Sequence, residues 1–425
     1  MIFNSCPLFL LFLIIACCFC DDSPDQETDD ALGKVVFANI MFRHGDRTPV
    51  VSYPNDPYRN ENLWPVPFGQ LTNLGKHQQL QLGMWLRQRY NHLIPKIYSV
   101  YDIYVRSTDV DRTLMSAESN LAGLYPPFGN QEWDIKRWMP IPVHTTPVEE
   151  DMLSGNKYCE RYNYELENVN KSPEMVEINK KNEELYKYLS KMSGSSINSL
   201  ETLLFLYNTL FIEEIYNKTL PKWTASVYPD KMEPLAVKSF EIETYNQILK
   251  RLKSGPLLKE MIKNMVLKSK NALTPDRKLW IFSAHDETVA NMLNTLGVFE
   301  PHCPPYAATI LIELRVDARM EYFVTVSYKN STKDAKVMTL PGCIPACPLH
   351  QFIKLTRDVV PTNWERECLM GFKEYQFNVD KDALIVMLSI SVLTLVLLSF
   401  ITILFVLWTR KKDAQYYSRL DSDGT

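Results

Sequence analysis

Short apolar runs separated by longer helical patterns organise the first part of the chain. Residues 35–42 form a nearly continuous apolar run that ends at Arg43, which is typical of a strand buried on both faces. A run of this kind is too short for a helix, so it favours a strand in a sheet. Further strands are predicted at 100–105, 278–283, 309–315 and 321–328.

Each of the first three strands is followed by a predicted helix. Thr72 is a suitable N-cap, and the apolar residues behind it fall near one face, which predicts a helix of about five turns. Residues 107–109 form a turn and cap before a helix that runs to about Leu124. Residues 284–286 precede a helix that ends near Gly297, a natural C-cap. This alternation indicates an α/β fold, a doubly wound sheet with helices on both faces.

Residues 146–270 have a different character, because helical, charged stretches dominate and no strand pattern is found. Helices are predicted at 177–192, 199–216 and 238–253. We interpret the region as a mostly helical insertion, a cap domain that covers one end of the sheet. The α/β core is then discontinuous and consists of residues 33–145 and 271–370.

The N-terminus has a pattern that is typical of a signal peptide. Residues 7–19 are apolar, and the acidic residues that begin at Asp21 follow this run. The small residues Cys18 and Cys20 stand at the −3 and −1 positions of a cleavage site after residue 20. No Lys or Arg precedes the run, which departs from the usual signal, but the run is too short for a comfortable membrane span. Residues 1–20 are therefore predicted to be a signal peptide.

The C-terminus carries a predicted transmembrane helix. Residues 383–408 contain no charge, and a helix of this length would reach about 39 Å, enough to cross a bilayer with some tilt. The basic residues 410–412 follow directly and belong on the cytoplasmic side. The chain is therefore predicted to be a single-pass type I membrane protein, with its large N-terminal part outside the cell or in a lumen. Residues 409–425 form the cytoplasmic tail.

Charge and composition narrow the functional classes. The formal net charge is −4, with 46% hydrophobic and 23% charged residues, which is ordinary for a globular protein. No basic stripe is present, so nucleic acid is not expected as a partner. Four of the nine cysteines lie in the predicted signal, and an oxidising lumen allows disulfides among the other five. Sequons for N-glycosylation in such a compartment are Asn170, Asn217 and Asn330.

Cationic and titratable residues gather at three strand-to-helix junctions. These are residues 43–49 (RHGDRTP), 106–113 (RSTDVDRT) and 283–286 (SAHD). Ligands of an open α/β sheet bind where the carboxyl ends of the strands meet the loops, so the three junctions can converge on one site. A helix N-terminus adds unpaired N–H groups and a positive dipole end, and both suit a phosphate group.

The residue types at these junctions suit phosphoryl transfer. The reaction needs cations on the phosphate oxygens, a nucleophile in line and an acid for the leaving group. Arginines contact phosphate in a bidentate manner, which lysine cannot do. His44 lies between Arg43 and Arg47, whose charges disfavour its protonated form and keep it nucleophilic. Gly45 is expected to let the backbone approach a ligand closely.

These motifs resemble the histidine acid phosphatases, whose signature is RHGxRxP, and in particular their prostatic and lysosomal group. The stretch 106–117 and the SAHD at 283–286 are similar to the other two blocks of the family, in the same order and at similar separations. Flanking stretches at 68–72, 140–145 and 341–348 agree as well. The resemblance covers residues 34–368. Three blocks in order are far more specific than a lone RHG.

The resemblance implies a role for each site residue. His44 would be the nucleophile that forms a phosphohistidine, and Asp286 would protonate the leaving oxygen. Arg106 would support its loop, Asp46 occupies the variable position of the signature, and no metal or cofactor is implied. The phosphate would be bound by Arg43, Arg47, Arg112 and His285.

The same resemblance implies disulfide pairings. The prostatic and lysosomal group pairs its cysteines in three bridges, and Cys159 with Cys368 and Cys343 with Cys347 match two of them. The partner of Cys303 in the third bridge would fall near residues 205–208, where this chain has no cysteine. Cys303 is therefore expected to be a free, buried thiol.

The resemblance predicts an acid phosphatase that acts on phosphomonoesters. A mutase or phytase of the same superfamily is an alternative, although mutases are usually short cytosolic chains without signal or anchor. A receptor or adhesion module on an inactive scaffold is the alternative from another class, and the complete set of catalytic residues argues against it.

The C-terminal tail and the family resemblance lead to predictions of where the protein is located and whether it forms a dimer. Residues 417–420 (YSRL) look like a tyrosine-based sorting signal that an adaptor would read, as in the tail of the lysosomal enzymes. The predicted location is lysosomal, endosomal or at the cell surface, with the catalytic part lumenal or extracellular. Related enzymes are often dimers, which favours a homodimer.

Overall fold

The computed structural model describes residues 32–134, 138–371 and 381–422. The predicted signal peptide, residues 1–20, lies outside the described residues. The chain divides into two units, Met1–Met370 and Gly371–Thr425, so the predicted core and the helical insertion share one unit.

A seven-stranded mixed sheet forms the centre of the first unit, with the strand order β2-β3-β1-β4-β5-β6. Strands β1 and β2 both pair parallel to β3, and the strands from β4 onward pair antiparallel, β7 with β5. The three parallel strands are the ones that end in the charged junctions. The bounds are β1 Lys34–Arg43, β2 Ile103–Ser107, β3 Leu279–Ala284, β4 Thr309–Val316, β5 Tyr322–Lys329, β6 Ala335–Met338 and β7 Cys347–Pro348.

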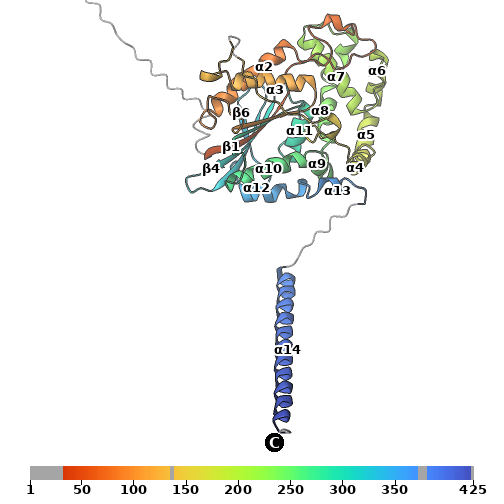
Figure 1. Ribbon diagram of the computed structural model, residues 1–425. Coiled ribbons are helices and arrows are strands. Elements are labelled where there is room, and N and C mark those ends of the chain that lie inside the picture. Colours follow the sequence, from red (N-terminus) through yellow and green to blue (C-terminus); the bar gives the residue numbers. More distant parts are fainter. Residues whose placement is uncertain (1–31, 135–137, 372–380, 423–425) are drawn as a thin grey trace, which may run out of the picture. The chain divides into compact units, whose positions relative to one another are not determined.

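Helices cover both faces of the sheet, as predicted (Figure 1). On one face Leu82 and Leu86 of α2 and Leu121 of α3 pack with Ile40 of β1. On the other face α10, α11 and α12 pack against side chains of β1, β3 and β4 in a second apolar cluster. The bounds are α2 Asn73–Arg89, α3 Asp111–Leu124, α10 Gly255–Ser269, α11 Asp286–Thr295 and α12 Leu349–Thr356.

The insertion is helical, and the described residues between 146 and 270 contain no strand. The predicted helix 177–192 is instead two helices that meet at Asn182, whose side-chain amide donates to the Ile178 carbonyl at 2.8 Å. The predicted helix 238–253 is also broken, because the Asn246 side chain caps α9. The bounds are α4 Glu160–Asn170, α5 Pro173–Lys181, α6 Glu183–Ser193, α7 Leu200–Ile215, α8 Glu233–Ile242 and α9 Gln247–Lys253.

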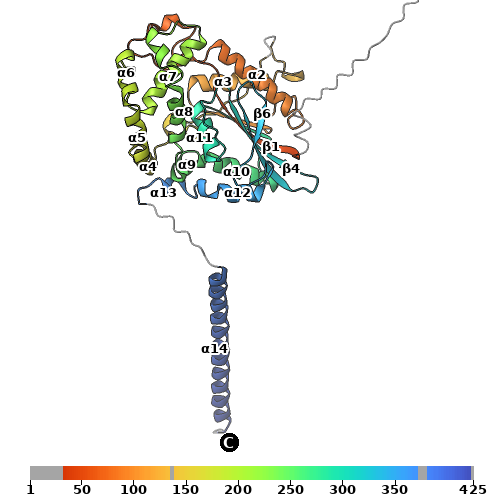
Figure 2. The same cartoon turned by 180° about the vertical axis from the view of Figure 1, so that it is seen from behind.

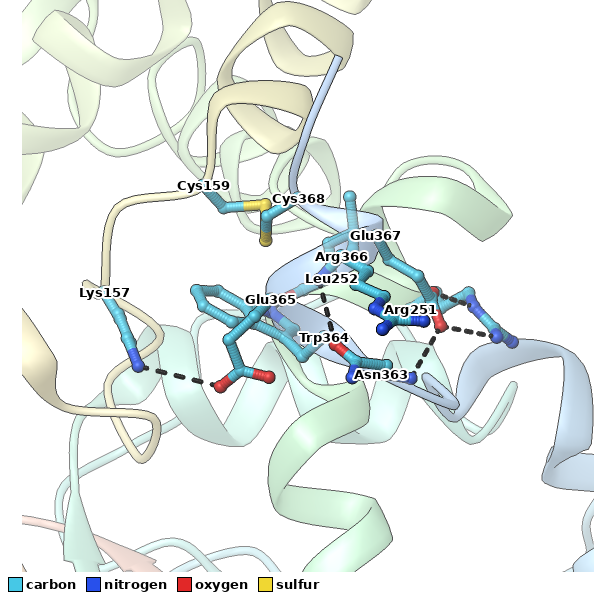
Figure 3. The surroundings of a disulfide bond; sticks show 10 residues. All are labelled: Lys157, Cys159, Arg251, Leu252, Asn363, Trp364, Glu365, Arg366, Glu367 and Cys368. Carbon is cyan, nitrogen blue, oxygen red and sulfur yellow. Dashed lines mark hydrogen bonds and ion pairs between the residues drawn. A yellow bond between two sulfur atoms is a disulfide. The ribbon is translucent and has the colours of Figure 1, made fainter. Parts of the chain in front are cut away.

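A disulfide between Cys159 and Cys368 ties the insertion to the end of the first unit (Figure 3). Cys159 precedes α4, and Cys368 follows α13 (Trp364–Glu367). Beside the bond, Arg251 of α9 forms an ion pair of 2.5 Å with Glu367, and the Trp364 indole donates to the Leu252 carbonyl at 2.9 Å. The disulfide therefore links the insertion to α13, and these polar contacts hold the same two parts of the chain together.

The other cysteines follow the pairing that the resemblance implies, but Cys303 is less buried than expected. Cys343 and Cys347 form a second disulfide. Cys303 is a free, half-buried thiol, and burial raises its pKa to about 12. The sequon residues Asn170 and Asn217 are exposed, and Asn330 is half-buried.

The second unit contains one long helix, α14 (Lys381–Ser422). Its segment Leu388–Lys412 is long and apolar enough to cross a membrane. This segment overlaps the predicted span 383–408, and the helix continues through the predicted tail as far as Ser422. In Figure 2 the helix is seen from behind as one continuous element.

Two buried carboxyl groups lie near each other, one in the loop between β1 and α2 and the other in α7. Asp56 of this loop is 4% exposed and Glu213 is fully buried. The charges of Arg59 and Lys218 lower the pKa values of Asp56 and Glu213, respectively, but do not outweigh burial. Burial, followed by the charge of Asp56, raises the pKa of Glu213 to about 8. Burial also raises the pKa of Asp56, so the fold favours the protonated form of Glu213.

This pair contributes stability in acid that is lost as the pH rises. The folded form binds the proton on Glu213 more tightly than the unfolded chain does, so the contribution of Glu213 to the free energy of unfolding falls as the pH rises from the ordinary 4.5 through about 8. The slope of this contribution is at most about 1.4 kcal/mol per pH unit. The melting temperature of Glu213→Gln, measured relative to that of the wild type, should therefore rise as the pH is raised from 4.5 to 8. The melting temperature of the exposed control Glu118→Gln relative to the wild type should not change with pH, and a constant difference for Glu213→Gln would contradict a protonated Glu213.

Candidate active site

The three charged junctions meet at one edge of the sheet. Strands β2, β3 and β1 are neighbours and parallel, so their carboxyl ends lie side by side. Backbone hydrogen bonds link the junctions directly, from the His44 N–H to the Ala284 carbonyl at 2.9 Å and from the Thr108 N–H to the Ser283 carbonyl at 3.2 Å. The structure therefore brings together all six predicted catalytic and phosphate-binding residues.

His44 lies buried at the end of β1 with its ring fixed. Its Nδ1 is 2.7 Å from the Gly45 carbonyl, which can only accept, so Nδ1 carries the hydrogen. The lone pair of neutral His44 is then on Nε2. Burial lowers the pKa of His44 well below its ordinary value, and the charges of Arg43, Arg112 and Arg47 lower it further. The fold therefore favours the neutral form of this imidazole.

Three guanidinium groups surround this imidazole. Arg43 donates to the Pro304 carbonyl at 2.5 Å and pairs with Asp286 at 2.8 Å. Arg47 donates to the Thr48 carbonyl at 3.1 Å. In the described part of the chain, the Nε atoms of Arg43, Arg47 and Arg112 are buried without a hydrogen-bond partner.

The site carries more positive charge than it neutralises. Burial, followed by the charge of Arg47, lowers the pKa of Arg112 to about 10. Asp286 forms a direct ion pair with one of the three arginines, Arg43. Buried donors without partners and uncompensated cations favour a bound anion with several oxygens, such as phosphate. No group of His, Cys, Asp and Glu among the described residues could hold a metal ion.

His285 and Asp286 come from the start of α11. His285 is the N-cap residue, and its Nε2 is hydrogen-bonded to the Thr108 hydroxyl at 3.0 Å. Burial lowers the pKa of His285 to about 3, with Arg112 adding to the effect. Burial alone would raise the pKa of Asp286, but Arg43, Arg47 and His285 outweigh it and hold this pKa below its ordinary value. The ring centroids of His44 and His285 are 5.7 Å apart, so both face one small space.

Gly45 and Arg106 were also expected to have particular roles near the site. Gly45 was expected to give a ligand room, but a Cβ there would lie 2.2 Å from the Gly75 carbonyl oxygen. The glycine therefore lets the loop at residues 43–49 pack on α2. The expectation was wrong because the position that a Cβ would occupy points at the backbone of Gly75. Arg106 pairs with Glu260 of α10 at 3.1 Å, away from the cluster of arginines. This placement agrees with a supporting role.

Sequence reasoning missed Tyr306. Its buried ring lies 5.9 Å from His44 and carries the Arg43 guanidinium 4.3 Å above its centroid. The contact holds Arg43 by a cation–π interaction. Nothing in the chain around Tyr306 distinguishes it from other tyrosines, so no sequence signal could have found it.

Asp46, which was set aside as the variable position, is fully buried behind the site. It accepts hydrogen bonds from the Thr72 hydroxyl at 2.5 Å and from the Tyr216 hydroxyl at 2.6 Å. Tyr216 ends α7, so this contact joins the helical insertion to the catalytic loop. Burial raises the pKa of Asp46, and the two hydroxyl donors oppose that rise.

The chain has close relatives in sequence. Residues 34–329 match the family described as histidine phosphatase superfamily (branch 2). The chain is 38% identical to the lysosomal acid phosphatase of Homo sapiens over 381 residues, which cover 87% of this chain and 88% of that protein. It is 38% identical to the prostatic acid phosphatase of Homo sapiens over 346 residues, which cover 79% and 88%.

Solved structures share the fold at much lower identity. The phytase of Citrobacter braakii superposes with a TM-score of 0.61 and 17% identity, over 79% of this chain and 100% of that one. The phytase of Hafnia alvei in complex with myo-inositol hexakis sulphate gives 0.61 and 18%, over 80% and 99%. At this identity the likeness shows the fold alone.

Proposed function

The chain belongs to the histidine phosphatase superfamily (branch 2), and on that premise we propose that it hydrolyses phosphomonoesters through a phosphohistidine on His44. Its similarity to the lysosomal and prostatic enzymes over most of the chain supports acid phosphatase activity. One observation carries the mechanism. A neutral imidazole with a free Nε2 lies among three guanidinium groups whose Nε atoms have no partner in the described structure.

The first half of the reaction uses this arrangement directly. The phosphate oxygens bind Arg43, Arg47 and Arg112, and the phosphorus atom then faces His44. Nε2 of His44 forms a bond to phosphorus while the bond to the alcohol oxygen breaks. Asp286 gives its proton to that oxygen. In the second half, water gives a proton back to Asp286, attacks phosphorus and releases His44 and inorganic phosphate.

The charge of the substrate prepares Asp286 for this role. Without a ligand, Arg43 and Arg47 hold the pKa of Asp286 below its ordinary value, so the carboxyl is ionised. A bound phosphate offsets the arginine charges and therefore raises the pKa of Asp286 in the complex. Proton uptake is thus linked to substrate binding, which explains why such a site works in acid.

We further propose that α14 anchors the protein in a membrane, with the catalytic unit lumenal or extracellular. The segment Leu388–Lys412 has the required length and composition. The basic residues 410–412 at its end favour a cytoplasmic tail. The similarity to lysosomal acid phosphatases supports a lysosomal membrane location, with residues 417–420 as a sorting signal.

The nucleophile is tested by trapping. Wild-type enzyme mixed with labelled substrate and quenched in alkaline denaturant should carry one phosphate that acid removes. His44→Ala should lose the label and at least about 1,000-fold in kcat, because the second imidazole at the site, His285, has its Nε2 hydrogen-bonded to the Thr108 hydroxyl. His77→Ala, an exposed histidine of α2, serves as the control. Label retained in His44→Ala would contradict the phosphohistidine.

Asp286 is tested by comparing leaving groups. An alkoxide needs a proton to leave, whereas a nitrophenolate does not. Asp286→Asn should therefore slow alkyl phosphates by about 10² to 10⁴-fold and activated aryl phosphates much less. In the wild type, the rate for alkyl phosphates should fall as the pH rises through the pKa of Asp286 in the complex. Equal losses for both substrates, with an unchanged alkaline limb, would exclude Asp286 as the proton donor.

The anchor is tested by truncation. A chain that ends before Ala383 should be secreted in soluble, active form, because the folded catalytic unit ends before this point. In the full chain, Tyr417→Ala should shift the protein toward the cell surface, as measured by surface labelling. A truncated protein that stays with membranes would contradict the anchor, and an unchanged distribution of Tyr417→Ala would remove the sorting signal alone.

A further inference from the structure

The hydroxyl group of Tyr306 is a donor that the protein leaves without a partner. The Tyr306 side chain lies in the core and is only 6% exposed. Its hydroxyl makes no hydrogen bond to any residue that the structure describes. It is also not one of the fully enclosed polar atoms that lack a partner. The small exposed part of this residue therefore includes the hydroxyl, which is free to meet a ligand.

The backbone fixes Tyr306 beside the nucleophile. Tyr306 lies in the loop before β4, and two backbone hydrogen bonds join this loop to the end of β1. The Ala307 N–H donates to the His44 carbonyl at 3.2 Å, and the Arg43 N–H donates to the Ala308 carbonyl at 2.9 Å. The ring centroids of Tyr306 and His44 are 5.9 Å apart. The fold therefore sets the distance from the tyrosine to the nucleophile before any substrate binds.

The hydroxyl lies among the groups that surround the proposed phosphate position. Burial raises the pKa of Tyr306, and the charges of Arg47 and Arg43 oppose the rise. Burial lowers the pKa of Arg112, and Tyr306 is among the groups that oppose this shift. All three arginines are thus close enough to interact with the hydroxyl, which keeps its proton. A hydroxyl adds a donor to this site without adding a fourth positive charge.

We propose that the Tyr306 hydroxyl donates a hydrogen bond to a non-bridging oxygen of the bound phosphate, as a substrate-binding residue beside the four that the motifs predict. The ring of the same residue orients a second ligand of the phosphate, because the Arg43 guanidinium lies 4.3 Å above its centroid. The inference rests on the proposed function, since it requires the phosphate to lie at His44.

The experiment measures the binding of inorganic phosphate to the full chain in detergent at pH 5, by titration calorimetry. Tyr306→Phe removes the hydroxyl and keeps the ring over Arg43. Its dissociation constant for phosphate should be about 10 to 100-fold higher than that of the wild type, because a hydrogen bond to a charged group is lost. For an aryl phosphate, kcat/KM should fall by a similar factor.

Melting temperatures separate this role from a structural one. Without phosphate the hydroxyl has no protein partner, so Tyr306→Phe should melt at the wild-type temperature. Added phosphate should raise the melting temperature of the wild type more than that of the variant, because stabilisation by a ligand grows with its affinity. Tyr53→Phe is the matched control, since Tyr53 is also buried with an unpartnered hydroxyl but packs against Trp223 of the insertion. It should keep the wild-type affinity for phosphate.

A second variant tests the ring. Tyr306→Leu removes the ring together with the hydroxyl, so Arg43 loses its cation–π contact. This variant should bind phosphate more weakly than Tyr306→Phe does. Equal affinities of the two variants would overturn the orienting role of the ring.

Three results for Tyr306→Phe would overturn the contact with phosphate. They are an unchanged affinity for phosphate, a lower melting temperature without phosphate at unchanged affinity, and a lower kcat at unchanged affinity, which would place the hydroxyl on the leaving oxygen. In each case a wild type that binds phosphate and forms the phosphohistidine keeps the proposed function. A wild type that neither binds phosphate nor hydrolyses phosphomonoesters would overturn both.

Discussion

The repulsion among Arg43, Arg47 and Arg112 is the constraint on which the site depends. Three guanidinium groups are held around one buried imidazole, and one of them, Arg43, pairs directly with Asp286. Charges in this arrangement are costly unless an anion joins them, since burial removes most of the solvation by water. In the proposed reaction, phosphate supplies that anion. Burial, and after it the same charges, lower the pKa of His44 and favour its neutral form, so in this proposal one arrangement serves both the binding of phosphate and the attack on it.

Contacts from several parts of the chain fix the site around the arginines. Arg43 is held by the Pro304 carbonyl and the ring of Tyr306, both on the loop before β4. Backbone hydrogen bonds join the ends of the three parallel strands. Behind the loop, Tyr216 of the insertion donates to Asp46. Because these contacts come from distant parts of the chain, the site is complete only when the whole first unit is folded.

The sequence by itself determined the elements that depend on local pattern and the residues that belong to motifs. Apolar runs and caps located five of the seven strands and most helices of the described structure. The three motif blocks pointed to His44, Asp286 and the arginines, and the family resemblance implied the cysteine pairs. The tertiary structure alone decided the antiparallel half of the sheet, the packing of Gly45 on Gly75, the place of Tyr306 and the pairing of Asp56 with Glu213. The reason is physical. Periodicity and capping act between near neighbours along the chain, whereas burial, pKa shifts and cavities arise from side chains that only folding brings together.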